Sequence, residues 1–137
     1  MSAASNYLEL KVLDHVLRYS SAPYTAPTTL YVGLFTNTSG NAATNLEAGT
    51  LTDEVSGGSY VRKTITFSAA SSGSSASAAT VTFDAASANW GTVTHVAILD
   101  ASTSGNVLFW GAVTSAKTIE TGDTFQITAG SLTISLA

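Results

Sequence analysis

The sequence contains no cysteine, and only 10% of its 137 residues are charged. Without cysteine, neither a disulfide framework nor a zinc site built on thiolates is possible. Typical soluble domains carry about 25% charged residues, so this surface lacks much of the charge repulsion that keeps monomers apart. We infer a surface made to meet other protein, with a monomer that has a neutral, hydroxyl-rich surface as the alternative.

Basic residues are scarce, and long apolar runs are missing. The chain has 5 basic and 9 acidic residues, a net charge of −4, and a single adjacent basic pair, Arg62-Lys63. Because no basic patch is available to neutralise phosphates, no nucleic-acid partner is expected. No apolar run approaches the length of about 18 residues that a membrane span needs, and Met1–Ser5 does not resemble a secretory signal. We expect a protein that is made in a cytoplasm and has no membrane partner.

One amphipathic helix is predicted at about residues 6–19. Ser5 is a suitable N-cap, and Glu9 lies near the first turn, where an acidic side chain is favourable. At about 100° per residue, the apolar side chains share one arc of the helix, and Lys11, Asp14, His15 and Arg18 lie opposite. The apolar arc contains Leu10, Val12, Leu13, Val16 and Leu17. We expect this face to lie on the protein's own sheet, with a neighbouring subunit as the alternative.

The remainder of the chain is typical of strands separated by Gly, Ser and Asn turns. Thr28–Phe35 is apolar on both faces, which predicts a central strand that is covered on both sides. The other predicted strands are Tyr60–Phe67, Thr80–Phe83, Val93–Leu99, Val107–Thr114, Thr124–Thr128 and Leu132–Leu136. Tyr60–Phe67 is predicted to be half-exposed, with Val61, Ile65 and Phe67 pointing inward and Arg62, Thr64 and Thr66 pointing outward. The length of 137 residues predicts one domain, residues 1–137, and the absence of a further visible helix argues against parallel βαβ units. Its fold would be mainly β, an antiparallel, jelly-roll-like β-sandwich of about seven strands (28–136) with one N-terminal amphipathic α-helix.

Two segments are predicted to be irregular. Asn37–Gly58 is longer than most connections, and loops of that length are usually functional or disordered. Ala69–Ala79 consists almost entirely of Ser, Ala and Gly, which cannot bury a core. We expect both segments to be mobile without a partner, and to contact that partner together with the N-terminal segment.

No residue pattern in the chain indicates catalysis, a cofactor or a metal. His15 lies on the polar helix face, and His95 lies within a strand, where a hydrogen-bonded structural role is expected. Asp53 and Glu54 are adjacent in a loop, so their side chains should point apart and be solvated rather than form a catalytic pair. Asp100–Asn106 offers one carboxylate with hydroxyls and an amide, which favours a hairpin loop over a calcium site. We therefore predict no enzymatic activity, no catalytic residues, no cofactor and no metal.

Aromatic and apolar residues in the predicted loops are the candidates for contact with a partner. Trp90 follows Asn89 in the loop before a strand, whereas Trp110 lies inside an apolar strand and is expected to pack in the core. The predicted interface residues are Asn89, Trp90, Tyr60, Leu46, Leu51 and Val55.

Five sequence segments are informative in their order and wording: Asn6–Leu17, Tyr24–Thr36, Val55–Arg62, Asn89–His95 and Thr121–Asp123. Together they resemble a family of small virion proteins of tailed bacteriophages, usually called tail fibre protein or capsid decoration (cement) protein. The resemblance covers nearly the whole chain and implies a non-enzymatic virion component.

The resemblance does not by itself choose between head and tail. From the compact predicted fold, the low charge and the absence of a fibrous shaft, we expect a capsid cement protein that is made in the host cytoplasm and bridges major capsid subunits on the outer surface of the head. Its partners would be the major capsid protein and copies of itself, as a dimer or trimer. The alternative is a tail fibre or tail-tip module that binds host glycan, with exposed aromatic rings stacked on sugars.

Overall fold

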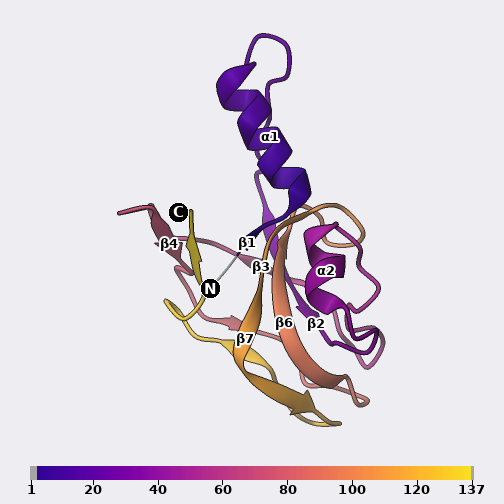
Figure 1. The fold of residues 1–137 in the computed structure, drawn as a ribbon. Coiled ribbons are helices and arrows are strands. Elements are labelled where there is room, and N and C mark those ends of the chain that lie inside the picture. Colours follow the sequence, from indigo (N-terminus) through magenta and orange to yellow (C-terminus); the bar gives the residue numbers. More distant parts are fainter. Residues whose placement is uncertain (1–2, 137) are drawn as a thin grey trace.

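A five-stranded antiparallel sheet forms the middle layer of the protein in the computed structural model, which describes residues 3–136 (Figure 1). The strands, in spatial order, are β1 (Ala3–Ala4), β7 (Val107–Ile119), β6 (Gly91–Leu99), β2 (Leu30–Phe35) and β3 (Lys63–Ile65). In the β2–β6 register, Val32 lies opposite Ile98 and Phe35 lies opposite His95. β2 is therefore an inner strand, as predicted from its apolar composition.

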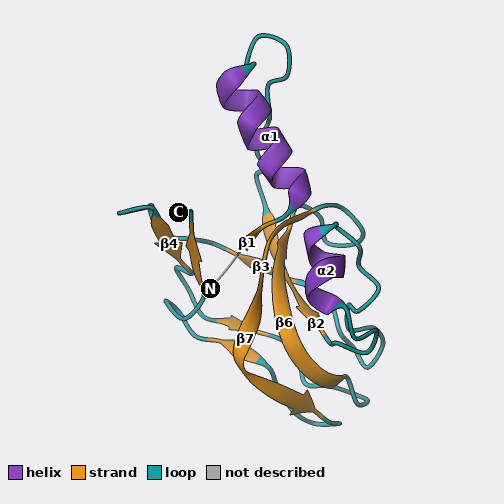
Figure 2. Cartoon of the chain, viewed as in Figure 1, coloured by secondary structure: helices purple, strands orange, loops and turns teal. Residues whose placement is uncertain are grey.

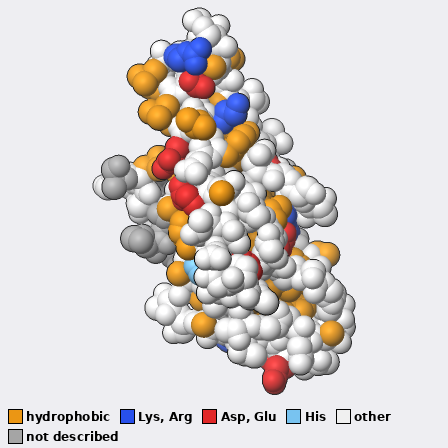
Figure 3. Space-filling view, turned by 45° about the vertical axis from the view of Figure 1, so that its right-hand side comes forward, with side chains coloured by type: hydrophobic (Ala, Val, Ile, Leu, Met, Phe, Trp, Pro, Cys, Tyr) orange, Lys and Arg blue, Asp and Glu red, His pale blue; other side chains and the backbone are white. Residues whose placement is uncertain are grey.

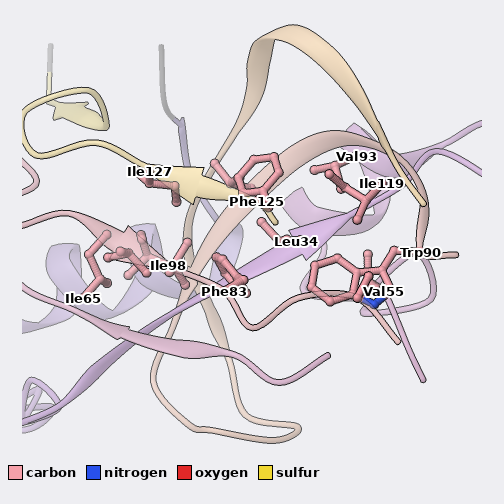
Figure 4. Close-up of a cluster of buried hydrophobic side chains, with 14 residues drawn as sticks. Leu34, Val55, Ile65, Phe83, Trp90, Val93, Ile98, Ile119, Phe125 and Ile127 are labelled. Carbon is pink, nitrogen blue, oxygen red and sulfur yellow. The ribbon is translucent and has the colours of Figure 1, made fainter. Parts of the chain in front are cut away.

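One face of this sheet is covered by two short antiparallel ribbons. The first ribbon pairs β5 (Val81–Thr82) with β8 (Gln126–Ile127), and the second pairs β4 (Ser74–Ala76) with β9 (Thr133–Ser135). The main hydrophobic core lies between the ribbons and the sheet (Figure 4). Phe83 lies at its centre, with its ring 5.9 Å from that of Phe125 and 6.4 Å from that of Trp90.

The opposite face is covered by a short helix, α2 (Ala42–Glu47), which lies within the segment predicted to be irregular. Leu46 of α2 is fully buried against Phe35 of β2 and Leu99 of β6. The expectation that Asn37–Gly58 is irregular is therefore wrong for α2. The prediction of a single helix missed it because six residues are too few to show a helical period.

The predicted fold is confirmed: the protein is mainly β and antiparallel, and its N-terminal helix is present (Figure 2). All seven predicted strands occur, with different end points, and β1 and β4 are additional. β4 lies in the segment Ala69–Ala79, where Ser74 pairs with Ser135 of β9. A backbone ladder needs no apolar side chains, which explains a strand in this composition. Because the second layer is split into two ribbons, the sandwich stays open beside them.

The predicted alternation of Tyr60–Phe67 is wrong at its beginning. Val61, expected to point inward, is 54% exposed, whereas Arg62, expected to be solvated, is buried. The alternation holds only from Lys63, where the strand begins.

The N-terminal helix, α1 (Asn6–Leu17), projects away from the β-rich body (Figure 1). Within residues 3–136, no helix is long and apolar enough to cross a membrane.

Candidate assembly surface

Ser5 anchors the base of α1 to the sheet. Its side chain is fully buried and accepts a hydrogen bond from the Leu8 amide at 3.3 Å, which caps the helix as predicted. The same hydroxyl donates to the Val107 carbonyl, and the Ser5 amide donates to the Leu108 carbonyl at 2.9 Å. Both acceptors lie at the start of β7, so the first turn of the helix has a fixed origin on the sheet.

The chain that returns from α1 to the sheet packs along the polar side of the helix. The Tyr24 amide donates to Nδ1 of His15 at 3.0 Å, and the rings of His15 and Tyr19 meet edge to face at 5.0 Å. Arg18 and Asp14 form an exposed i, i+4 ion pair at 3.2 Å. We call α1 together with the returning segment 18–29 the arm.

The opposite side of α1 is apolar and uncovered. We define the arm face as Leu10, Val12, Leu13, Val16 and Leu17. These side chains are 42–74% exposed, with Leu17 the most exposed. Leu8 is the one residue of the helix that is buried. The expectation that α1 lies on its own sheet is therefore wrong, because α2 occupies one face of the sheet and the ribbons occupy the other.

The arm face is energetically unfavourable in water. Burying a Leu or Val side chain contributes about 1.5–3 kcal/mol, so covering this face would stabilise a complex by on the order of 5 kcal/mol. Scattered apolar residues are ordinary on a protein surface, but a contiguous patch marks a site of contact. Hydrophobic side chains gather along the projecting arm in the space-filling view (Figure 3).

A second apolar surface lies where the sandwich is open, between the β4–β9 ribbon and the large sheet. This groove has a volume of about 310 Å³ and is lined almost entirely by apolar atoms. Its large apolar lining residues are Leu30, Phe67, Ile98, Leu108, Phe109, Ile134 and Leu136. Leu136 is 62% exposed, so part of the groove wall is open to solvent.

Trp90 and Tyr60, two of the predicted interface residues, lie together in the core. The Trp90 ring is 6% exposed, donates from Nε1 to the Gly58 carbonyl at 2.8 Å, and meets the Tyr60 ring edge to face at 5.5 Å. Burial and the neighbouring Glu54 carboxylate raise the pKa of the Tyr60 phenol. These two rings stabilise the fold, and a partner could reach only the loops that carry them.

The other four predicted interface residues are not brought together. Leu46 is fully buried and Leu51 packs beside it under α2, whereas Val55 belongs to the main core on the other face of the sheet. Asn89 is exposed, and its side-chain oxygen accepts from the Thr121 amide at 3.0 Å. An interface role for these loops stays a prediction.

Glu54 and Arg62 form a partly buried polar network. Nε of Arg62 lies 2.6 Å from one Glu54 oxygen, and Nη2 lies 2.7 Å from the other. Nη1 of Arg62 donates to the carbonyls of Ala101 and Ser104. The expected solvation of Glu54 is therefore wrong: through Arg62, its carboxylate helps to join the loop before β3 to the β6–β7 hairpin.

Asp53 points away from Glu54, as predicted for adjacent residues, but it is buried rather than solvated. Its carboxylate accepts from the Ser39 hydroxyl at 2.6 Å, from the Ser39 amide at 2.8 Å and from the Asn45 amide group at 3.2 Å. The hydrogen bond from the Ser39 hydroxyl lowers the pKa of Asp53, which burial opposes. This carboxylate holds the loop that positions α2.

The remaining side chains that could take part in catalysis or metal binding form structural hydrogen bonds. Nδ1 of His95 lies 2.8 Å from the Thr94 hydroxyl, and burial lowers the pKa of its imidazole while Asp53 opposes this. Asp100 accepts from the amide and side chain of Asn106 and closes the hairpin, as predicted. Among the described residues, no three His, Asp or Glu side chains cluster as metal ligands.

The model of one protein family, described as Podophage GP4 fiber I protein gp80, matches residues 3–135. The chain belongs to this family. The predicted membership of a tailed-phage virion family is thereby confirmed, and the protein is a structural component of a phage virion. A search of curated proteins finds no match. The matched residues include the whole of α1 and every lining residue of the groove except Leu136.

The apolar surface of α1 could be predicted from the sequence, but the groove could not. The apolar arc of α1 is visible as a helical period, although the period does not say what covers it. The groove has no sequence signal, because Leu30, Leu108 and Leu136 come together only when β2, β7 and the C-terminal segment are packed.

Proposed function

We propose that this protein is a non-enzymatic subunit of a virion fibre and that the arm face is its assembly contact. The observation that carries the proposal is the exposure, at 42–74%, of five large apolar side chains on the projecting helix α1. The family description, which names a podophage fibre protein, supports the fibre over other virion structures.

A purely structural role is supported by the hydrogen bonds that the potentially reactive side chains form within the fold. His95, Asp53 and Glu54 are each engaged in hydrogen bonds that hold loops or strands. The carboxylates of the adjacent residues Asp53 and Glu54 face different partners, so they do not form a catalytic pair. Contact area, and not chemistry, is the property that this surface provides.

Capsid decoration is the second candidate. The low charge favours it, and so does the compact β-rich body, because a cement protein must sit flat across capsid subunits. In that role the major capsid protein would be the partner, and binding two capsid subunits at once would raise the effective concentration for the second contact. Glycan stacking on Trp90 is not part of either proposal, because that ring is buried.

Labelling of purified virions tests the proposal and separates its two forms. Gold-conjugated antibody against the chain should mark the tail or its fibres, and a gel of the virions should show few copies. Label spread over the head, with hundreds of copies, would instead establish the decoration role. Absence of the chain from washed virions would overturn both.

The contribution of the arm is tested by complementing a phage that lacks this gene. The variant Leu13→Glu, which changes a 56% exposed residue of the arm face, should reduce incorporation into virions at least tenfold. Val61→Glu changes a 54% exposed residue outside the arm and should be incorporated normally. Equal incorporation of both variants would contradict a role for the arm face.

A further inference from the structure

We propose that the open side of the sandwich binds an extended segment of a second, different polypeptide as an added β-strand. The segment would lie between β7 and β9 and pair with the outer edge of β7. Its apolar side chains, at every second position, would enter the space between the two layers. The inference concerns the β-rich body and goes beyond the proposed role of the arm. It rests on an unpaired strand edge and on the unfilled apolar space beside that edge.

The outer edge of β7 has little strand pairing within residues 3–136. β7 lies between β1 and β6, but β1 pairs with it only at Phe109 and Trp110. The register of β6 and β7 also shifts between Val93 and His95, so residues 113–116 of β7 have no partner in β6 either. Native sheets often protect such an edge with a charged side chain or a proline, and residues 111–116 contain neither. This edge is therefore open to pairing with another chain.

Two apolar cavities join along this edge. The groove described above, of about 310 Å³, is continuous with a second cavity of about 360 Å³, because Ile98, Phe109 and Ile134 line both. We call the groove and this second cavity together the cleft. β7 forms one wall of the cleft, and the opposite wall contains residues of β9. Figure 1 shows β9, in yellow beside the C label, between β4 and β7.

The length of the cleft matches a short strand. Residues 108–114 of β7 all line it, and at about 3.3 Å per residue they span roughly 20 Å. An extended segment of the same length points every second side chain to one face, so about three or four side chains would enter the cleft. A helix or a small apolar molecule could fill the same volume, but neither would pair with the backbone of β7. The unpaired edge therefore favours a strand.

The lining of the cleft defines the chemistry of the segment. Its floor consists of buried apolar side chains, which include Val96, Ile98, Phe125 and Ile127. Its exposed rim is polar and uncharged, with Thr114, Gln126, Ser131 and Thr133. No residue that lines the cleft is ionisable, so a charged side chain that entered it would lose its water without gaining a partner. We therefore expect an uncharged segment in which apolar residues alternate with polar ones.

A second copy of this chain is poorly suited to donate the segment. Within residues 3–136, the apolar side chains of the main strands already fill the copy's own two cores. The irregular segment that returns from α1 contains Pro23 and Pro27, and proline cannot donate a backbone hydrogen bond to a strand. Donation by a second copy would therefore remove apolar residues from that copy's own core. A different polypeptide is the expected donor.

Synthetic peptides test the proposal against the full chain. The probes are fluorescein-labelled heptapeptides in which Val, Ile or Leu alternates with Thr, each followed by a pair of lysines for solubility. Fluorescence anisotropy should show saturable binding of at least one probe, with a dissociation constant below about 100 µM. Peptides of the same composition, with their apolar residues grouped at one end, should bind at least about tenfold more weakly. Failure of all three probes to bind at about 1 mM would overturn the proposal.

Hydrogen exchange distinguishes an added strand from apolar binding alone. The bound peptide should slow the exchange of backbone amides within residues 111–114 at least about tenfold, because pairing gives these amides acceptors. Binding that leaves their exchange unchanged would overturn strand addition. If these amides instead become protected as the concentration of the chain alone rises from about 1 to 100 µM, the occupant is a second copy and a different donor is excluded.

Matched surface variants locate the binding site. Thr133→Lys places a charge on the exposed rim of the cleft, and Thr103→Lys places the same charge on the exposed β6–β7 hairpin. Because both positions are exposed, both variants should fold. Thr133→Lys should weaken peptide binding at least about tenfold, and Thr103→Lys should leave it unchanged. Equal binding to the two variants would place the peptide outside the cleft and overturn the proposal.

A tethered strand covers the case in which the free peptides associate with one another. The Val–Thr heptapeptide is appended after Ala137 through a Gly/Ser linker of about twelve residues, which has a span of roughly 20 Å. Tethering raises the effective concentration of the strand to about the millimolar range. The urea midpoint of unfolding should therefore be higher than that of a chain that carries the grouped control peptide. Equal midpoints would overturn the proposal.

Discussion

Glu54 and Arg62 face one another in a two-point ion pair, with nitrogen–oxygen distances of 2.6 and 2.7 Å. The Arg62 side chain is 2% exposed and that of Glu54 is 17% exposed. Because Arg62 also donates to the Ala101 and Ser104 carbonyls, the pair connects the loop before β3 to the β6–β7 hairpin. Removing one partner of such a pair leaves the other buried and uncompensated.

Glu54→Ala should therefore lower the free energy of unfolding by about 3 kcal/mol, measured by urea denaturation. Lys63→Ala is the matched control, because Lys63 pairs with Asp84 at 2.9 Å while the Asp84 side chain is 64% exposed. An exposed pair of that kind contributes less than about 1 kcal/mol. Equal losses in the two variants would show that the Glu54–Arg62 pair has no special role.

Gly58 and Gly57 provide a test of close packing around Trp90. A Cβ at Gly58 would lie 2.8 Å from Nε1 of Trp90 and 2.9 Å from the Ala88 carbonyl oxygen, at a φ of +57°. A Cβ at Gly57 would meet nothing within 4 Å, although its φ is +76°. Gly57→Ala should cost about 1–2 kcal/mol of backbone strain, and Gly58→Ala should cost at least about 3 kcal/mol.

The same two variants should differ in tryptophan fluorescence. Gly58→Ala displaces the Trp90 ring from the Gly58 carbonyl and should shift its emission to longer wavelength, whereas Gly57→Ala should leave the emission unchanged. If the two variants unfold at the same urea concentration, the tight contact at Gly58 does not exist in solution.

Asp53 should make the fold less stable in acid. Its pKa is lowered in the folded state, chiefly by the Ser39 hydroxyl, from an ordinary value of 3.8. A lowered folded-state pKa means that the stabilisation is present at neutral pH. It begins to fall near the ordinary pKa and is lost as the pH drops through the folded-state value. Asp53→Asn should therefore show a lower free energy of unfolding at pH 7 and a smaller decrease between about pH 5 and pH 3.

Parallel urea titrations of the two proteins at several pH values provide the measurement. His95 contributes a decrease of the same sign at higher pH, because burial lowers its pKa as well. The effect of Asp53 is therefore taken as the difference between wild type and variant. If the free energies of unfolding of wild type and Asp53→Asn fall in parallel below pH 5, the pKa of Asp53 is not lowered in the folded state.

Ser5 controls the origin of the arm. Ser5→Ala removes the cap of α1 and the hydrogen bond to the Val107 carbonyl, and should cost about 1–2 kcal/mol. Hydrogen exchange of the α1 amides should become faster before that of the β6–β7 amides, because the helix is anchored through its first turn. Ser20→Ala, at the exposed outer end of the arm, is the control and should change neither quantity.

Much of the fold could be predicted from local sequence. The alternation of apolar and polar residues located seven strands, and Ser5 before an apolar helical period located the start of α1. These features are local, because a strand or a capped helix depends on residues a few positions apart. The same reasoning failed at Arg62 and Val61. The partner that draws Arg62 inward, Glu54, lies eight residues earlier in a loop whose path only the packed structure defines.

The sequence by itself determined that one face of α1 must avoid water, since five aliphatic residues share its arc. What lies against that face was decided by tertiary structure. α2 and the two ribbons already cover both faces of the sheet, and the hydrogen bond from Tyr24 to His15 fixes the returning chain against the polar side of the helix. A helical period records which side chains are apolar, but it carries no information about competition for the surface that would bury them. That competition is resolved only when all elements are packed together, and it leaves the arm face free for another molecule.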